Sequence, residues 1–263
     1  MFLYSQKRLP RRTSGLVNDY LYFLKTSSDF MDIFRQLTSD KIMMKDFVRD
    51  RCGDGFTLPL MRIFESIEDI DLSGLTRPCV IKPAHGSGSV VFVDEGQAAL
   101  SSSDIDNLRS ALQTSPYSSA RERNYMYLRP RLICEPMLPS GAQTKDYKVF
   151  CYRGEPRSVQ VDSDRYISHR RNIYSSDWSP IEVCYNFSMG EWEPAPECLL
   201  EMMSLSRQLA QPFEFVRVDF FISEGKPYVG ELTHCPEAAH GRFRDRQEER
   251  IFSEILFGAA ASQ

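Results

Sequence analysis

The sequence has no run of apolar residues that approaches the roughly 18 needed for a membrane-spanning helix. It has no excess of one charge either, because 32 lysines and arginines stand against 36 aspartates and glutamates, which leaves a formal net charge of −4. That balance gives no electrostatic case for nucleic acid as a partner. The first residues place basic side chains after the apolar ones, which does not fit a secretory signal. We therefore expect a cytoplasmic protein without a membrane span.

The seven cysteines are odd in number and scattered, and no two of them are spaced as CxxC. Such spacing supports neither a disulfide framework nor a zinc site. Several cysteines stand inside apolar runs such as PCVIKP and VFCYR, where a free thiol behaves as a small core residue. Two nucleotide-binding motifs are missing as well, GxGxxG after a strand and GxxxxGK followed by Ser or Thr. Their absence argues against a Rossmann fold and a P-loop fold.

Apolar residues are plentiful. They make up 42% of the chain, which includes 17 Phe, 12 Tyr and 2 Trp, so a sizeable core can form. The length of 263 residues suits one large domain or two small ones. Apolar residues recur at helical spacing over 16–38 and 196–210, and a capping cluster predicts a further helix from Lys41 to Arg51. A shorter helical pattern interrupts the Ser-rich stretch 101–119.

Strand patterns alternate with these helices. Short apolar runs predict single strands at 79–83, 90–93 and 131–138. Two longer segments, 146–162 and 213–232, predict hairpins. The hairpin turns are expected at 153–155 and near 224–225. Runs of strands between helices, mostly joined by hairpins, indicate an α+β fold with antiparallel sheets.

The segment VIKPAHGSGSV (80–90) places Lys82 at the end of a strand, before a loop that contains Gly86 and Gly88. Glycines let backbone N–H groups approach a polyphosphate, and a lysine beside them supplies the positive charge that phosphates attract. The segment therefore predicts a phosphate-binding loop. The same residues also fit a simple hairpin turn with a surface lysine.

The second hairpin carries two acids, Asp219 and Glu231. On the first strand Arg217 and Asp219 face away from the apolar residues, and on the second strand Val229 and Glu231 are expected to share a face. A three-residue turn at 224–226 would place the two acids directly opposite each other, with Cβ atoms about 5 Å apart.

The length of this turn decides whether the acids form a metal site. A two-residue turn would put Asp219 and Glu231 on opposite faces. Two carboxylates directly opposite each other repel unless a cation lies between them, and their hard oxygen atoms suit Mg²⁺. The alternative is a solvated polar face on which Arg217 pairs with one acid.

Other segments carry polar side chains that fit either a site or a solvated surface. In ICEPML (133–138) an apolar strand delivers Glu135 where backbone groups could contact an adenine edge, and in DYKVF the side chains of Asp146 and Lys148 share one face of a strand. Arginines in 164–172 could bind an anionic substrate or a phosphoryl group, and residues after the second hairpin could line a substrate site. These candidates are Arg165, Arg170, Arg171, His234, His240 and Arg242.

The order of these segments resembles the ATP-grasp fold and, more closely, the TupA-like ATP-grasp family, named after a protein of teichuronopeptide synthesis. The matching phrases span about residues 38 to 240 and are SDKIMMKDFVRD, CVIKPAHGSGSV, LICEPML, DYKVFCYRGEPRSV, DRY, RVDFF and GELTHCPE. The resemblance implies two α+β subdomains whose antiparallel sheets hold ATP between them, after a shortened N-terminal region. We expect a helical segment over 1–40, a first subdomain with the Gly loop over 41–135 and a second with the metal-binding hairpin over 136–263.

The resemblance also implies ATP and Mg²⁺ as cofactors. Lys41 and Lys82 would hold the ATP phosphates from two sides, and Lys148 would face the nucleotide. A flexible loop would cover the β- and γ-phosphates, and it comprises His85, Gly86, Ser87, Gly88 and Ser89. The adenine would lie against the segment of Glu135, Pro136, Met137 and Leu138.

For the reacting end, the resemblance assigns Asp219 and Glu231 to Mg²⁺ and places Arg217 near the transferred phosphoryl group. Arg165 and Lys148 complete the candidate catalytic residues. Many ATP-grasp enzymes have Asn two residues after the second acid, and this chain has Thr233, whose hydroxyl is a poorer neutral metal ligand than an amide oxygen.

The implied activity is that of an ATP-dependent ligase. A substrate carboxylate attacks the γ-phosphorus of ATP, and an amine or another nucleophile then displaces phosphate from the acyl phosphate. The expected substrates are small-molecule or glycan carboxylates and amines of cell-surface polysaccharide, peptide-conjugate or secondary-metabolite synthesis. Two alternatives stay open: a kinase-like phosphotransferase acting on a sugar or small alcohol, and a nucleotide-binding module without turnover. The oligomeric state is open as well, a homodimer included.

Overall fold

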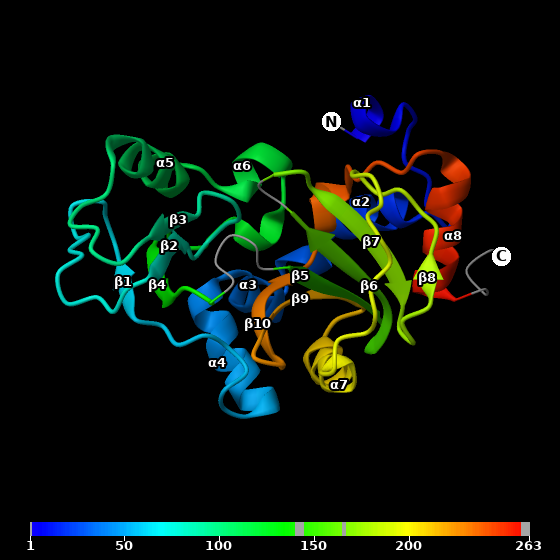
Figure 1. Cartoon of the computed structure of the whole chain (residues 1–263). Coiled ribbons are helices and arrows are strands. Elements are labelled where there is room, and N and C mark those ends of the chain that lie inside the picture. Colours follow the sequence, from blue (N-terminus) through cyan, green and yellow to red (C-terminus); the bar gives the residue numbers. More distant parts are fainter. Residues whose placement is uncertain (1, 140–144, 165–166, 259–263) are drawn as a thin grey trace.

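Two antiparallel sheets form the two lobes of the molecule (Figure 1). The computed structural model describes residues 2–139, 145–164 and 167–258. The small sheet has the order β1-β4-β2-β3, with β1 at Arg62–Phe64, β4 at Leu132–Pro136, β2 at Cys79–Pro83 and β3 at Val91–Val93. The large sheet has the order β10-β9-β5-β6-β7-β8, with β10 at Lys226–Thr233, β9 at Phe215–Ser223, β5 at Asp146–Tyr152, β6 at Glu155–Ser163, β7 at Arg170–Ser175 and β8 at Pro180–Ile181. The predicted α+β fold with antiparallel sheets is confirmed.

The helices are α1 (Phe2–Gln6), α2 (Val17–Thr26), α3 (Ile33–Ser39), α4 (Lys41–Cys52), α5 (Ser102–Gln113), α6 (Pro116–Ala120), α7 (Leu199–Ala210) and α8 (Arg246–Phe257). Short 3₁₀ turns lie at η1 (Ser28–Met31), η2 (Arg123–Tyr125) and η4 (Pro236–Ala239). The helix predicted from Lys41 is confirmed, and the Asp40 side chain caps it by accepting from the backbone N–H groups of Ile42 and Met43. Within the described ranges, every helix is too short or too polar to cross a membrane.

The single helix predicted over 16–38 is wrong. The chain forms α2, the turn η1 and then α3, and the break has a local cause. Asp32 has extended backbone angles, and its side chain accepts hydrogen bonds from the N–H groups of Phe34 and Arg35, so it starts a new helix. Helical spacing of apolar residues continues across this break, which is why the pattern suggested one helix.

The small sheet separates an apolar face from a polar face by simple alternation along β2. Cys79 and Ile81 are fully buried in a core that includes Leu108 of α5. The alternate residues, Val80 and Lys82, point to the opposite side, where they line a cleft.

The large sheet also separates an apolar face from a polar face, by alternation along β9. Val216, Val218 and Phe220 pack against α7 and α4, as the alternation predicts. On the opposite face the helices α2 and α8 cover only one end, around Phe215. The other end of that face carries Arg217 and Asp219 and stays open to the cleft. The sheets therefore turn their charged strips toward the same space.

The hairpin of β9 and β10 has a two-residue turn, Glu224-Gly225, because Lys226 pairs with Ser223. The turn lies at 224–225, as expected, and the three-residue turn on which the metal hypothesis depended is absent. The expected pairing of Asp219 with Glu231 is nevertheless present, since a β-bulge between Val229 and Glu231 shifts the register by one residue.

The bulge also corrects the predicted faces of β10. Val229 is buried in the core with Val218 and Phe220, whereas Glu231 lines the cleft, so the two do not share a face. The extra residue is Gly230, and a Cβ atom there would lie 2.5 Å from the Phe221 ring. Glycine is required at this position because the aromatic ring lies directly on the bulged backbone.

Candidate active site

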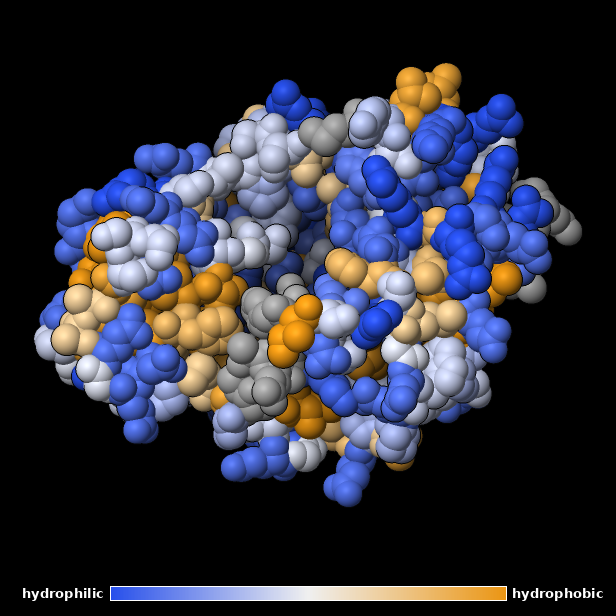
Figure 2. Space-filling view, turned by 45° about the horizontal axis from the view of Figure 1, so that its top comes forward, coloured by the Kyte–Doolittle hydropathy of each residue, from blue (hydrophilic) through white to orange (hydrophobic). Residues whose placement is uncertain are grey.

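The charged strips of the two sheets border one cleft of about 1120 Å³. Figure 2 shows it as a hollow between the two lobes. The volume lies slightly above the roughly 300–1,000 Å³ typical of small-molecule sites. We call its two sides the small-sheet wall, formed by β2, β3, β4 and the segments 84–90 and 111–125, and the large-sheet wall, formed by β5, β6, β9, β10 and η4.

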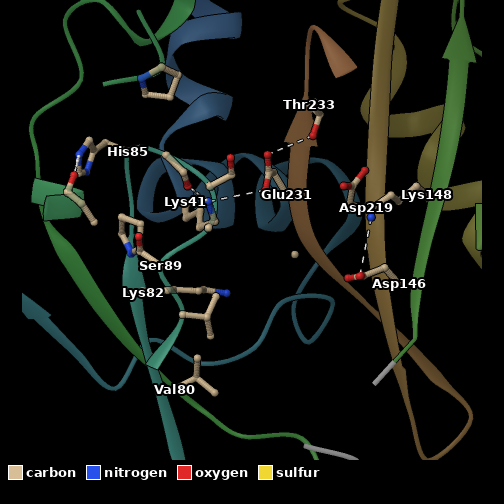
Figure 3. A pocket seen from close by; sticks show the side chains of 18 of the residues that line it. Lys41, Val80, Lys82, His85, Ser89, Asp146, Lys148, Asp219, Glu231 and Thr233 are labelled. Atoms are coloured by element: carbon tan, nitrogen blue, oxygen red, sulfur yellow. Dashed lines mark hydrogen bonds and ion pairs between the residues drawn. The ribbon is translucent and has the colours of Figure 1, made fainter. Parts of the chain in front are cut away.

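Lysines gather at the small-sheet wall. Lys82 extends into the cleft from the end of β2 (Figure 3). Its Nζ lies 2.5 Å from Glu135 Oε2 on the neighbouring strand β4. The other oxygen of Glu135 lies 2.6 Å from Lys45 Nζ on α4. Burial alone would raise the pKa of Glu135, but the two lysines outweigh burial and lower it. Glu135 is therefore a buried anion that positions Lys82, rather than a solvated strand end.

Lys41 connects the two walls. It is the first residue of α4, whose N-terminus is fixed against the end of β2 by the bond from Lys41 N–H to the Ala84 carbonyl. Its Nζ donates to the Gly86 carbonyl at 2.5 Å and lies 3.7 Å from Glu231 Oε2 on β10. One ammonium group thus contacts both the glycine loop and an acid of the large-sheet wall.

The glycine loop lines the cleft with His85, Gly86, Ser87, Gly88 and Ser89. The His85 ring is buried, with Nδ1 accepting from the Arg131 N–H and Nε2 3.2 Å from the Ala111 carbonyl, so it attaches the base of the loop to β4 and α5. Burial lowers the pKa of His85. In contrast, Ser87 and Gly88 are exposed at the tip. The loop is held at its base while its tip faces the solvent.

On the large-sheet wall Arg217 forms a bidentate ion pair with Asp219, with both N···O distances 2.6 Å. The Arg217 Nη2 also donates to the Thr233 hydroxyl, which in turn donates to Glu231 Oε1 at 3.1 Å. The pairing of Arg217 with one acid agrees with the alternative to a metal site, but the face is buried at the cleft and is not a solvated surface.

The two acids differ in their electrostatic surroundings. Burial raises the pKa of Asp219, although Arg217 and Lys148 oppose that change. Burial would also raise the pKa of Glu231, but Lys41 and Arg217 outweigh it and lower the pKa. Glu231 is thus held as an anion, and Asp219 depends on Arg217 for its charge.

Lys148 of β5 is held by Asp162, a fully buried residue of β6. Asp162 also accepts two bonds from Arg171, from Nε at 2.6 Å and from Nη2 at 3.0 Å, and one from Gln160. Burial opposes its charge, but Lys148 and Arg171 outweigh burial and hold the pKa of Asp162 well below its usual range. This carboxylate fixes two cations of the large-sheet wall at once.

Comparison with known proteins agrees with this geometry. Residues 25–257 match the family described as TupA-like ATPgrasp. The chain belongs to the TupA-like ATP-grasp family. No curated protein matches the sequence.

Solved structures similar to this TupA-like chain include an L-amino acid ligase from Bacillus licheniformis, with 13% identity, a TM-score of 0.46 and coverage of 75% of this chain and 44% of that one. A D-alanine–D-alanine ligase from Bacillus anthracis complexed with ATP has 16% identity and a TM-score of 0.46, and the match covers 84% and 65% of the two chains. The ATP-grasp ligase PsnB with minimal precursor, Mg and ADP has 15% identity and a TM-score of 0.41, with 88% and 61% covered. The TupA-like chain thus spans less than two thirds of the length of each of these proteins.

The donor set of this TupA-like site suits a nucleotide. Lysines lie beside the glycine loop at one end, and Val80, Met137 and Leu138 supply an apolar lining nearby. The lysines and the glycine loop suit phosphates, and the apolar lining suits an aromatic base. Pro136 lines the same region, whereas the side chain of Glu135 is engaged by Lys45 and Lys82.

The same site suits a magnesium ion held partly by phosphates. Among the described residues there is no cluster of three or more His, Cys, Asp or Glu side chains that could hold a metal alone. Mg²⁺ is commonly bound through one or two carboxylates together with substrate phosphates and water, and Asp219 and Glu231 supply two. The Thr233 hydroxyl contacts Glu231, so it orients that acid in this structure.

Six residues were candidates for binding a substrate or phosphoryl group, and five of them lie in the described ranges. Of these five, only Arg171 lines the cleft, where its Nη1 lies 3.3 Å from Glu237 Oε1. His234 is a correction: it is buried between Arg35 and Thr38, with ring distances of 3.1 and 2.8 Å, and points to α3. The other three also lie outside the cleft lining: His240 contacts the Ser5 hydroxyl, and Arg170 and Arg242 are exposed. Arg165 falls outside the described residues.

Several residues of this site escaped the sequence analysis. Lys45 stands one helical turn after Lys41, so helical spacing could have indicated it. Asp162 looks like an ordinary polar residue of an alternating strand, and only its burial reveals its role. Glu122 lies in an irregular segment without any motif, and it lines the cleft.

Proposed function

We propose that this protein is an ATP-dependent ligase that activates a carboxylate as an acyl phosphate and transfers the acyl group to an amine. The observation that supports this most strongly is the opposition of the two walls. Lys41 and Lys82 stand on one side of the cleft, and Asp219 and Glu231 stand paired on the other (Figure 3). Phosphates between these groups would meet cations on one side and, through Mg²⁺, carboxylates on the other.

The chemistry asks the protein mainly for positioning and charge neutralisation. Lys82 and Lys41 would bind phosphate oxygens, with Glu135 and Gly86 holding their ammonium groups in place. Arg217 would stabilise the phosphoryl group while the carboxylate attacks, and Mg²⁺, when bound, supplies further neutralisation of phosphate charge. The exposed tip of the glycine loop would close to exclude water from the acyl phosphate.

We propose a substrate pair drawn from a carboxylate, such as a uronic acid, and a primary amine, such as an amino acid. Membership of the TupA-like family supports a role in cell-surface polysaccharide or peptide-conjugate synthesis by analogy. The cleft supports a carboxylate substrate, because Arg171 and Arg217 line it in addition to the lysines.

The first experiment is a thermal-shift titration with ADP in the presence and absence of Mg²⁺. A ligand at 100 times its dissociation constant adds about 2.7 kcal/mol of stability, so a clear shift is expected. The shift should depend on Mg²⁺ in the native protein and lose that dependence in Asp219→Asn. No shift in folded protein would contradict the nucleotide site.

A release assay for ADP then separates ligase from kinase. D-glucuronate, L-glutamate and acetate serve as carboxylate probes, with methylamine, hydroxylamine and glycerol as acceptors. A ligase requires a carboxylate and an amine together for sustained release of ADP. A kinase-like phosphotransferase releases ADP with a hydroxyl acceptor alone, such as glycerol. Release that never requires a carboxylate would overturn the ligase proposal.

A further inference from the structure

Glu122 occupies a distinctive place in the cleft. It follows α6 and precedes η2, and it lines the small-sheet wall as a partly buried residue. Nearby, Lys25 of α2 donates to the carbonyls of Ala120 and Ala238, which ties the segment before Glu122 to η4 on the other wall. Among the described residues, no hydrogen bond or ion pair engages the Glu122 side chain.

Backbone contacts place Glu122 where the small-sheet wall meets η4, because Ala120, two residues before it, and Ala238 of η4 both accept from Lys25 Nζ. The charged groups that act on Glu122 are Lys25, Glu231 and Arg217. The titratable groups that face it from the surrounding elements are Lys25, Tyr125, Arg217, Glu231 and Cys235. Glu122 therefore lines the cleft beside groups of both walls.

Burial raises the pKa of Glu122 to about 8, with Glu231 adding to the rise and Lys25 and Arg217 opposing it. An amine acceptor arrives at neutral pH as an ammonium ion and must lose a proton before it can attack. An ordinary carboxylate is too weak a base for that proton, whereas a base whose pKa is nearer to that of the ammonium ion takes it with a smaller penalty.

We propose that Glu122 is a catalytic residue of this cleft, whose carboxylate receives the ammonium group of the acceptor and removes one of its protons. The inference rests on the ligase activity proposed above and defines the acceptor as a primary amine. In its ionised form, which predominates above about pH 8, Glu122 recognises a cation by charge, which a neutral hydroxyl acceptor cannot match.

One proton passes from the ammonium nitrogen to a Glu122 oxygen and leaves a neutral amine. The nitrogen lone pair then forms the C–N bond to the acyl carbon, and the bond from that carbon to the phosphate oxygen breaks, with its electron pair going to the departing phosphate. The second surplus proton of the nitrogen passes to that phosphate, which leaves as hydrogen phosphate. Glu122 finally returns its proton to the solvent.

The test compares two probe nucleophiles in the wild type and in Glu122→Gln. Methylamine is an ammonium ion near neutral pH and needs a base, whereas hydroxylamine is already unprotonated and does not. D-glucuronate, L-glutamate and acetate are the carboxylate probes, and products are measured as methylamide or hydroxamate. We expect Glu122→Gln to lower methylamide formation about 100-fold and to leave hydroxamate formation within about twofold of the wild type. Glu197→Gln, which removes an exposed carboxylate outside the cleft, should change neither product.

The outcomes distinguish this inference from the proposal on which it rests. If the wild type forms no hydroxamate with any probe, the ligase proposal fails and the role of Glu122 fails with it. If hydroxamate forms but the variant makes methylamide at the wild-type rate, only the role of Glu122 is overturned. An equal loss of both products would assign Glu122 to carboxylate activation and would also overturn the inference.

A measurement on the protein alone gives an independent check. Infrared spectra of the wild type and Glu122→Gln, subtracted at each pH, isolate one carboxyl group. We expect that group to ionise near pH 8. Ionisation near the ordinary value for glutamate would contradict the inference even if the variant were inactive.

Discussion

The small-sheet wall and the large-sheet wall differ in how their charges are held. On the small-sheet wall, Lys82 and Lys45 share one acid, Glu135. The second acid of this wall, Glu122, is mostly protonated at neutral pH, because burial raises its pKa to about 8. The loop tip at Ser87 and Gly88 is exposed. On the large-sheet wall three basic residues face five acids, namely Lys148, Arg171 and Arg217 against Asp146, Asp162, Asp219, Glu231 and Glu237. One wall has surplus positive charge near a free loop, and the other has surplus negative charge in a closed network.

This difference suits two tasks. Surplus lysines can bind phosphates when a nucleotide enters, and an exposed loop tip can move over them. Surplus acids need a cation, and a rigid network keeps Asp219 and Glu231 in place for it. Lys41 contacts both walls, so closure of the loop and the charge of Glu231 are coupled through one side chain.

The largest effect is expected on the large-sheet wall from Asp219→Asn or Glu231→Gln. Each removes one of two carboxylates for Mg²⁺, which is worth several kcal/mol, so turnover should fall about 1,000-fold or more. ADP release measures the loss, and circular dichroism checks that the fold survives. Glu224→Gln, an exposed acid on the same hairpin, is the matched control. Full activity in either site variant would refute the metal assignment.

Gly230→Ala tests whether the closed network depends on the bulge. A Cβ atom 2.5 Å from the Phe221 ring should displace Glu231, with about 1–3 kcal/mol lost in unfolding free energy and turnover lowered about 100-fold. Urea unfolding and ADP release give the two values. Adding Phe221→Ala removes the clash and should restore part of both. A double variant no better than the single one would contradict this account of the bulge.

Lys82→Ala tests the surplus charge of the small-sheet wall. Loss of a charged contact to phosphate costs about 1.5–3 kcal/mol, so the affinity for ADP should fall about 10- to 100-fold in a thermal-shift titration. Lys45→Ala removes the other partner of Glu135 but does not line the cleft, and it should change the affinity much less. Equal effects of the two variants would show that the lysines act only through Glu135.

The smallest effect concerns stability and pH. Between about pH 4.5 and 8 the folded protein holds a proton on Glu122 that the unfolded chain releases, so this residue lowers the stability of the wild type as pH rises. Glu122→Gln lacks that penalty. Its melting temperature should equal that of the wild type near pH 4.5 and exceed it by at least about 2–4 °C at pH 9. A difference that does not change with pH would count against the raised pKa.

Much of the fold follows from local pattern. The alternation along Cys79–Pro83 and Phe215–Ser223 fixes which residues face the cleft, and Gly154 and Gly225 mark both turns, where they adopt positive φ. Strand alternation and turn glycines depend only on residues that are close in sequence, so both can be predicted from the sequence. The last two strands of the large sheet, β7 and the edge strand β8, fall in a segment without such a pattern.

The remainder of the site depends on contacts between distant residues. A one-residue bulge at Gly230 reverses the expected face of Val229, and nothing in VGEL distinguishes it from a regular strand. The burial of Asp162 results from strands on either side, and His234 is turned away by its contacts with Arg35 and Thr38. The nucleotide, metal and substrate roles of the cleft residues stay predictions.

The bulge also divides the hairpin of β9 and β10 into two separately paired parts. Because Gly230 lies between the turn and Glu231, the outer ladder of residues 220–229 is separate from the ladder that pairs the two acids. An exchange of this tip for another two-residue turn, or its extension by equal lengths on both strands, would leave the acids opposite each other. The length of the hairpin can therefore change without loss of the pairing between Asp219 and Glu231.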